Sequence, residues 1–377
     1  MLGMASTRKI EKQKERGQVS LAAFLKRSRL NWLLVFVPMS LMIYIFAFPK
    51  LWLFIASALG IVPLAGLIGQ STEELACRMG PGAGGLLNVT FGNAPELIIG
   101  FFALQSGLQV LVKASISGSI IGNVLLVLGL SMFAGGWSRD KQTFSRTNVG
   151  ASSAMLFLAT VAMVMPALFS FAIFGSLQST GITIEIISLL VAAVLIASYL
   201  ASLVFSLKTH RTILAPLGRK VEKPRLSLAG SATLLILATA IVAVLSELLV
   251  ESIAETVSAL GLTQFFVGVV IVAVIGNAPE HASAVVSAKK DIMDLSLTIS
   301  IGSATQIALF VSPILVFASF LLGSPMSFVF NAFEITGIAL SVASVTIVAL
   351  DGESNWFEGV QLLAVYLILV IVFFFVP

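Results

Sequence analysis

The sequence contains a single cysteine, Cys77, and only two histidines. One cysteine excludes an internal disulfide framework and a thiolate metal cluster, and with so few histidines a zinc site is not expected. The sequence also contains no P-loop, HExxH or GxSxG pattern, which are the motifs of nucleotide-driven pumps, zinc proteases and serine hydrolases. We therefore expect neither an enzyme nor a bound cofactor.

Charge is equally scarce. Charged residues make up 11% of the chain and hydrophobic residues 58%, which is too apolar for a soluble domain of this length. The composition predicts a polytopic membrane protein whose main surroundings are a lipid bilayer. The net charge of +4 does not indicate nucleic acid, because the basic residues fall between the apolar runs, where membrane topology explains them.

The apolar runs predict an all-α fold with eleven transmembrane helices, at about 20 residues each. A basic tail, residues 1–30, precedes them; it is too long and lacks the cleavage site of a signal peptide, and its end at Leu21–Leu30 is expected to form a short amphipathic helix on the membrane surface. The predicted spans are residues 31–48, 51–70, 86–106, 109–134, 148–172, 183–207, 227–249, 265–287, 293–321, 328–350 and 357–376.

The distribution of Lys and Arg tests this topology. With a cytoplasmic N-terminus, 20 of the 22 Lys and Arg fall in the tail or in cytoplasmic loops, and only Lys50 and Lys113 fall on the other side. Positive charge is enriched in cytoplasmic loops of membrane proteins. One span more or less would destroy this segregation, so the pattern supports eleven spans.

The sequence repeats itself. Shifting the chain by 184 residues places GNAPE at residues 92–96 on GNAPE at residues 276–280. In the predicted topology the two copies cross the membrane in opposite directions. We therefore expect one extra N-terminal helix (31–50), two inverted five-helix repeats (51–207 and 227–377) and a cytoplasmic linker (208–226). Secondary transporters use this plan and place their site at the midplane between the repeats.

Each GNAPE copy places a carboxylate, Glu96 or Glu280, inside an apolar run that crosses the bilayer. The proline before each glutamate lacks a backbone N–H, so the carbonyl four residues earlier loses its helical partner. At membrane depth such backbone is tolerated only if it is buried in protein or lines a wet cavity. We therefore expect a broken helix at each copy, with the freed carbonyls of Phe91 and Ile275 available as ligands.

Glutamates at equivalent positions of an inverted repeat are expected to face each other. Two such charges cannot both stay ionised in an apolar site without a cation, so the empty pair should hold a proton that a divalent cation displaces. Asn93 and Asn277 add neutral oxygens, and an all-oxygen shell suits a hard cation such as Ca²⁺. The structural alternatives are a neutral glutamic acid, and asparagines that merely join helices.

The spans that follow each motif carry small and hydroxyl residues. Close helix packing explains most of them. Four are also candidates for ligands or for supporting groups around the ion: Ser119, Asn123, Ser303 and Gln306.

Further carboxylates lie at the predicted ends of the second and seventh spans. Glu73 and Glu247 are candidates for an access path that relays protons, and His281, beside Glu280, could relay protons or be a satisfied core histidine. Simple solvation is the favoured explanation for Glu74, Glu251 and Glu255, and structural roles are favoured for Glu185 and Glu334.

At these residues the chain resembles the calcium/cation–proton antiporter family of the cation/calcium exchanger superfamily. STEELACRMGPGAGGLLNVTFGNAPELI (71–98) is similar to the first repeat motif of that family. IGNAPEHASAVVSAKKDIMDLSLTISIGSATQIALFVSP (275–313) is similar to the second motif, and DGESNWFEG (351–359) also looks familial. The resemblance covers nearly everything after residue 45.

The resemblance implies that Glu96 and Glu280 are the central cation and proton carboxylates. It implies gating or proton-path roles for Glu73 and Glu247, and His281 matches the histidine that follows the second glutamate of the family. The function implied is export of cytoplasmic Ca²⁺ in exchange for protons. The alternatives are sodium-coupled calcium exchange, exchange of other divalent cations such as Mn²⁺, and, in a different class, a passive cation channel.

The segment between the two halves is short and basic here, whereas it is often acidic in eukaryotic members of the family. An acidic regulatory helix is therefore not expected, and a prokaryotic plasma membrane is the expected location. The sequence leaves open whether the protein is a monomer or a homo-oligomer.

Overall fold

The computed structural model describes residues 24–25, 28–177, 180–209 and 224–376. Residues 21–23 and 26–27 of the expected surface helix at Leu21–Leu30, and most of the tail and linker, lie outside these residues, so that helix stays a prediction. The helices include short 3₁₀ (η1) and π-helical (η2 to η5) segments. The elements are η1 Arg29–Val35, α3 Phe36–Ile45, α4 Lys50–Gly92, α5 Ala94–Gln105, α6 Gln109–Ile121, η2 Gly122–Val127, α7 Leu128–Gly136, β1 Gln142–Thr143, α8 Arg146–Phe174, α9 Ile182–Val204, η3 Phe205–Thr209, α10 Leu228–Leu260, α11 Gln264–Phe266, η4 Val267–Val272, α12 Ala273–Lys289, α13 Met293–Gln306, η5 Ile307–Val311, α14 Ser312–Leu321, α15 Ala332–Val348, β2 Glu353–Ser354 and α16 Trp356–Phe374.

The helices match the predicted apolar runs in position. Among the described residues, eight helices are long and apolar enough to cross a membrane, and the bent pair Leu86–Gly92 and Ala94–Gln105 makes a ninth span if it is counted as one. Two shorter apolar helices, Arg29–Ile45 and Ala332–Val348, occupy the places of the predicted first and tenth spans. The nearly all-helical fold is thus confirmed, and the total of eleven spans stays a prediction.

Large apolar side chains remain exposed on the outer surface of these helices. Phe171 on α8 is 59% exposed, Leu190 on α9 is 62% exposed and Ile236 on α10 is 67% exposed. Such side chains are solvated by lipid tails, which removes the penalty they would carry in water. The protein is an integral membrane protein.

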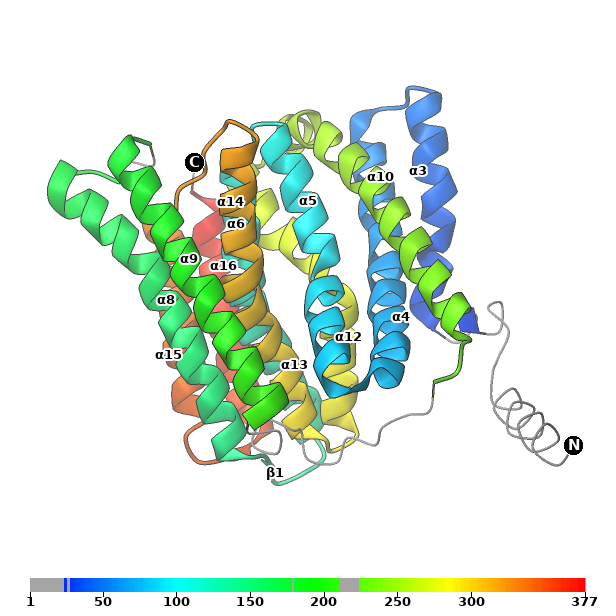
Figure 1. The fold of residues 1–377 in the computed structure, drawn as a ribbon, viewed down its shortest axis with the longest axis vertical. Helices are drawn as coiled ribbons and strands as arrows, with labels where there is room; N and C mark the ends of the chain where they lie inside the picture. The colour runs from blue at the N-terminus through cyan, green and yellow to red at the C-terminus, as the bar shows by residue number, and fades with distance from the viewer. Residues whose placement is uncertain (1–23, 26–27, 178–179, 210–223, 377) are drawn as a thin grey trace, which may run out of the picture.

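The helices form two groups with a core between them (Figure 1). Helices α3, α4 and α10 pack together on one side, α8, α9 and α15 lie on the other, and α5, α12 and α13 lie between. Helices α4 and α10 run antiparallel: Lys50 at the start of α4 pairs with Glu251 late in α10. At the other end, the Glu74 carboxylate late in α4 accepts hydrogen bonds from the backbone N–H groups of Arg225 and Leu226, just before α10.

Core helices of the two halves run in opposite directions. Gly118 of α6 lies against the backbone of Val269 in η4, and Gly135 of α7 lies against that of Ala288 in α12. These contacts make α6–α7 parallel to η4–α12. Because α13 turns back from α12 after Lys290, α13 runs antiparallel to α6. This is the relationship that an inverted repeat requires, while the exact boundaries of the two five-helix halves stay a prediction.

Side-chain caps fix several helix starts. Asn331 and Glu334 form a capping box at the start of α15, and Asn355 and Glu358 form another at the start of α16. The Ser145 hydroxyl accepts a hydrogen bond from the Asn148 N–H at the start of α8. Each cap satisfies backbone donors that a helix start leaves free.

Two short strands were not predicted. β1 and β2 pair antiparallel, with Gln142 opposite Ser354 and Thr143 opposite Glu353. An ion pair between Lys141 and Glu353 extends this contact, in which Glu353 raises the pKa of Lys141. The strands join the loop after α7 to the loop after α15 at one end of the bundle (Figure 1).

The sequence pattern also missed three π-helical segments in the core. η2 (Gly122–Val127) and η5 (Ile307–Val311) follow the third helix of each half, and they overlap when the chain is shifted by 184 residues. η4 (Val267–Val272) directly precedes α12. Isolated π turns within helices are frequent at functional sites. All three adjoin the residues described next.

Candidate ion-binding site

The first GNAPE copy lies at a break between two helices. Asn93, with φ −103° and ψ 21°, ends α4 and precedes α5, and the two helical segments bend by 47° there. Pro95 takes a position in the first turn of α5, where its missing N–H removes no helical hydrogen bond. The broken helix predicted here is confirmed. It places Glu96 in the first turn of α5, where the helix dipole favours negative charge.

The second copy does not break its helix. α12 runs from Ala273 to Lys289 through Pro279, so the predicted break at this proline is wrong. The proline removes one hydrogen bond to Ile275, but the turns on both sides are retained. The Asn277 side chain donates to the Ala273 carbonyl, and the Ser283 hydroxyl donates to the Pro279 carbonyl. Irregular backbone appears about two turns before this proline instead, in η4.

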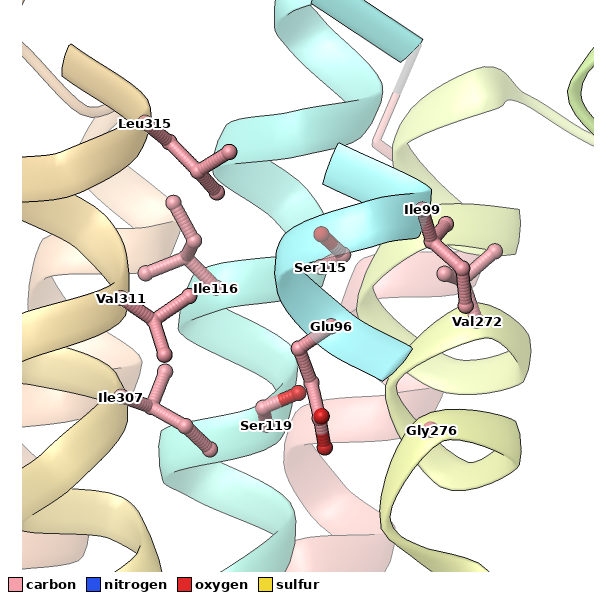
Figure 2. A pocket seen from close by; sticks show the side chains of 10 residues that line it. All are labelled: Glu96, Ile99, Ser115, Ile116, Ser119, Val272, Gly276, Ile307, Val311 and Leu315. Carbon is pink, nitrogen blue, oxygen red and sulfur yellow. The ribbon is translucent and has the colours of Figure 1, made fainter. Parts of the chain in front are cut away.

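The Glu96 side chain points into a narrow cavity between four helical segments (Figure 2). Ser115, Ile116 and Ser119 reach it from α6, Val272 and Gly276 from the η4–α12 segment, and Ile307, Val311 and Leu315 from the η5–α14 segment, with Ile99 one turn along α5. The cavity is small, with a volume of about 10 Å³, which is room for about one water-sized particle. Figure 2 shows the Glu96 carboxylate directed toward the Ser119 hydroxyl.

The two GNAPE copies meet at Glu96 and Gly276. A Cβ atom built on Gly276 would stand 3.2 Å from Glu96 Oε1. Glu280 follows Gly276 by about one turn of α12, and its carboxylate repels that of Glu96 electrostatically. The structure therefore brings the two predicted carboxylates together. The Ser303 hydroxyl lies beside the Glu280 carboxylate.

A chain of amides fixes the orientation of Asn123. The Asn277 amide nitrogen must face the Ala273 carbonyl, which can only accept, at 2.9 Å. The Asn277 oxygen therefore faces Asn123, whose amide nitrogen donates to it at 3.3 Å and to the Ser303 hydroxyl at 3.1 Å. Because its nitrogen is held in this way, Asn123 directs its own oxygen elsewhere.

Asn277 itself is satisfied on both ends. Its nitrogen also donates to the Ser119 hydroxyl at 3.0 Å, and its oxygen accepts a second contact from Ser303 at 3.4 Å. It joins three helices, which is the structural alternative considered for the asparagines. Asn93 differs, because its nitrogen donates to Gln306 Oε1 at 2.6 Å. The Gln306 oxygen therefore accepts a hydrogen bond from Asn93 and is not directed at an ion.

Four oxygens around this region are buried and have no hydrogen-bond partner. A buried polar atom without a partner is rare and calls for an explanation, such as an ion that occupies the site. All four belong to residues of the two motifs or of the amide chain, and all are acceptors. They are Asn93 Oδ1, Glu96 Oε2, Asn123 Oδ1 and Glu280 Oε2.

The type of these donors limits the ion they could hold. Two carboxylates and two amide oxygens form a hard, all-oxygen set, which suits Ca²⁺ better than thiophilic metals. In the part of the chain that the structure describes, no group of three or more His, Cys, Asp or Glu forms a metal site. The carbonyl of Phe91 already accepts the Asn93 N–H, and neither Phe91 nor Ile275 lines the Glu96 cavity.

The candidates for a proton path lie apart from this cavity. Glu73 on α4 and Glu247 on α10 are both exposed, and His281 is half-buried beside Glu280. Neither Glu73 nor Glu247 ends its helix, since α4 continues beyond Met79 and α10 continues to Leu260, so the expectation that they end membrane spans stays a prediction. Their roles stay a prediction.

Three further carboxylates can be compared with the solvated or structural roles expected for them. Glu74 is not merely solvated, because it accepts two backbone hydrogen bonds at the start of α10. Glu251 is exposed but paired with Lys50. Glu334 has the structural role expected for it, as a capping residue that is buried rather than at an open interface.

Both halves of the chain match a known family of proteins. Residues 49–208 and 230–375 match the family model described as "Sodium/calcium exchanger protein". The chain belongs to this family. The two matched stretches correspond closely to the two halves predicted from the repeat.

The relatives within the family are close over most of the chain. A Ca²⁺/H⁺ antiporter of Synechocystis sp. is 42% identical over 367 residues, covering 92% of this chain and 96% of that protein. The Ca²⁺/H⁺ antiporter ChaA of Bacillus subtilis is 40% identical over 343 residues, covering 90% and 96%. The resemblance read from the two motifs is thereby confirmed.

Solved structures of the family share the fold. The structure of native YfkE is 36% identical, with a TM-score of 0.80, and the match covers 93% of this chain and all of that one. The H⁺/Ca²⁺ exchanger CAX is 17% identical, with a TM-score of 0.67 over 92% of this chain, and supports the fold alone.

Sequence reasoning missed two parts of the site. It gave Gly276 no role, although a Cβ atom there would crowd the Glu96 carboxylate at 3.2 Å. It also treated Asn93 and Asn277 alike, whereas their hydrogen bonds differ. The glycine that begins each GNAPE copy could have pointed to the role of Gly276. No local pattern in the sequence distinguishes Asn93 from Asn277.

Proposed function

We propose that this protein is a secondary active antiporter that exchanges Ca²⁺ for protons. The observation that carries the proposal is a set of four buried oxygens without partners, one each from Glu96, Glu280, Asn93 and Asn123, in which the two carboxylates lie close enough to repel each other. Two carboxylates in an apolar environment need either protons or a cation to offset their charge. Ca²⁺ and protons then compete for the same oxygens, and this competition is the basis of exchange.

In the proposed site Glu96, Glu280, Asn93 and Asn123 supply oxygens to the ion, and water completes its shell, since Ca²⁺ takes six to eight oxygens. Gln306 and Asn277 hold Asn93 and Asn123 in orientation, and Ser119 and Ser303 hold Asn277 and Glu280. When Ca²⁺ leaves, protons occupy the two carboxylates. Glu96 can then stay in the apolar cavity without an unpaired charge.

Access to the site from alternate sides is proposed to involve the two halves moving about the site, as in other transporters built from inverted repeats. Glu73, Glu247 and His281 are proposed to carry or gate protons on the way. We propose an N-terminus in the cytoplasm and, from the bacterial relatives, a prokaryotic plasma membrane as the location. Ca²⁺ would then leave the cytoplasm as protons enter.

The family description also names sodium, which makes sodium-coupled exchange the second candidate. The names of the two relatives above favour protons. The purified protein in liposomes decides between them: ⁴⁵Ca²⁺ uptake is measured under an imposed pH gradient and then under a sodium gradient of equal size. Uptake that follows the pH gradient and collapses with a protonophore supports the proposal.

Uptake that follows only the sodium gradient would show that the protein is a sodium-coupled calcium exchanger. Flux that depends on neither gradient would indicate a channel. Mn²⁺ competing as strongly as unlabelled Ca²⁺ would broaden the substrate to divalent cations in general.

A further inference from the structure

Helix α6 presents polar side chains on two opposite faces. Ser115 and Ser119 face the cavity that holds Glu96. Gln109, Lys113 and Ser117 are spaced four residues apart and therefore share another face. This second face contacts the connection from α14 to α15, residues 322–331, and the first turn of α15, and none of its three side chains lines the cavity.

Each of these three side chains, on successive turns of α6, forms hydrogen bonds with the connection or with the start of α15. The Gln109 side chain donates to the carbonyls of Ser324 and Pro325. The Lys113 ammonium donates to the Val329 carbonyl at 2.9 Å and contacts the Ser327 hydroxyl at 3.4 Å.

One turn further along, the Ser117 hydroxyl lies 3.2 Å from Glu334 Oε1. The other oxygen of Glu334 accepts the Asn331 N–H and caps α15. The start of α15 is thus fixed to α6.

Lys113 and Glu334 are both removed from solvent, with 8% and 2% of their surfaces exposed. Their side chains do not form a direct ion pair, but they are near enough to attract one another electrostatically, while Val329 and Ser327 hold the ammonium and Ser117 and Asn331 hold the carboxylate. A buried charge is tolerated only when it is paired and hydrogen-bonded, so each of these residues depends on the other. Loss of either one leaves the other charge buried without its counter-charge, which favours a movement of α6 or of the start of α15.

Movement of α6 would reach the proposed ion site directly. Ser119 lies six residues after Lys113, about 9 Å along the helix axis. Ser119 holds Asn277, and Asn123, one turn further, offers one of the unpartnered oxygens. The same backbone therefore connects the Lys113 contacts to groups around the ion.

The other half of the chain has similar hydrogen bonds, between α13 and the start of α8. Asp294 of α13 accepts the Ser145 N–H at the start of α8, and Thr298, one turn later, accepts a hydrogen bond from the Asn148 side chain. Each third helix is therefore held to the start of a helix from the opposite half. Because α6 and α13 run antiparallel, the α6–α15 contact and the α13–α8 contact lie at opposite ends of the bundle, on either side of the site.

We propose that Lys113 and Glu334 are positioning residues for ion binding: together they fix α6 so that Ser119 and Asn123 remain at the ion site. This inference rests on the proposed function, because it assumes that the ion is held there. Two buried, oppositely charged residues outside the cavity thereby have a role in ion affinity as well as in folding.

The test measures binding of ⁴⁵Ca²⁺ to the full-length purified protein in detergent. Lys113→Met and Glu334→Gln each leave one buried charge without its partner, and each is expected to weaken binding by about tenfold. The double variant Lys113→Met/Glu334→Gln leaves no unpaired charge and is expected to recover most of the affinity. Lys50→Met, which breaks a lysine–glutamate pair unconnected to α6, is the matched control and should bind as the wild type does.

Each outcome decides the question. Monodisperse Lys113→Met protein that binds Ca²⁺ as tightly as the wild type overturns this inference while leaving the proposed function intact. A double variant as weak as the single variants also overturns it, since the pairing of charges would then be irrelevant. If Lys113→Met aggregates, Glu334→Gln, whose amide oxygen can still cap α15, carries the test alone. Wild-type protein that binds no Ca²⁺ overturns the proposed function, and this inference with it.

Discussion

The Glu96 carboxylate lies against the backbone of Gly276, so that the two copies of one pentapeptide touch. A side chain at 276 would begin 3.2 Å from Glu96 Oε1. The counterpart of Gly276 in the first copy, Gly92, has no atom within 4 Å of its would-be Cβ. The site is therefore asymmetric, although the two motifs are identical.

This asymmetry predicts different effects for one substitution at two places. Gly276→Ala should displace Glu96 by a few tenths of an ångström and weaken Ca²⁺ transport by about tenfold. Its stability should not fall, because alanine is more favourable than glycine within a helix by about 1 kcal/mol. Gly92→Ala is the control and should transport normally. The concentration of Ca²⁺ at half-maximal uptake and the melting temperature in detergent check both expectations, and equal behaviour of the two variants would contradict them.

The two central carboxylates should be indispensable. Glu96→Gln and Glu280→Gln keep the volume of the side chain but remove a charge that pairs with a buried cation. Breaking a buried ion pair costs about 3–5 kcal/mol, so affinity should fall at least about 100-fold in either variant. Glu255→Gln changes an exposed carboxylate of α10 and should be silent. Exchange by both central variants at the wild-type rate, in protein shown to be inserted, would remove the basis of the proposed site.

Competition for the same oxygens predicts a pH dependence of defined sign. At lower pH, protons occupy Glu96 and Glu280, so apparent Ca²⁺ affinity should fall; at higher pH it should rise until both carboxylates are free. Binding isotherms of the purified protein at a series of pH values measure this slope. In Glu280→Gln one competing carboxylate is absent, and whatever binding remains should depend less on pH. A slope that is unchanged in this variant would show that protons act elsewhere.

Close packing in the core predicts one substitution that the protein should not tolerate. A Cβ on Gly118 would lie 2.0 Å from the Val269 carbonyl oxygen, so the backbones of α6 and η4 would have to separate. Gly118→Ala should destabilise the protein by about 3 kcal/mol and lower its melting temperature. Gly122, one turn along, has open space around it, and Gly122→Ala should be nearly neutral. Equal melting temperatures for the two variants would mean that this contact is loose.

The amino-acid sequence predicts much of this protein because membrane insertion depends on local patterns. A span is an uninterrupted apolar run, and orientation follows the charges between runs, so neither requires a partner distant in the chain. The duplicated GNAPE motif likewise points to Glu96 and Glu280 without any structure. For the same reason the break at Pro95 could be anticipated.

Tertiary structure decided what those residues do. Pro279 stands in the same motif as Pro95, yet α12 continues through it, because side-chain hydrogen bonds and the packing of its ring on Gly66 of α4 support the helix. The direction of each asparagine depends on partners from other helices. An amide offers its oxygen to an ion only when its nitrogen is occupied, and a buried charge such as that of Lys113 persists only beside its counter-charge. These conditions arise where helices meet, and no pattern along a single helix contains them.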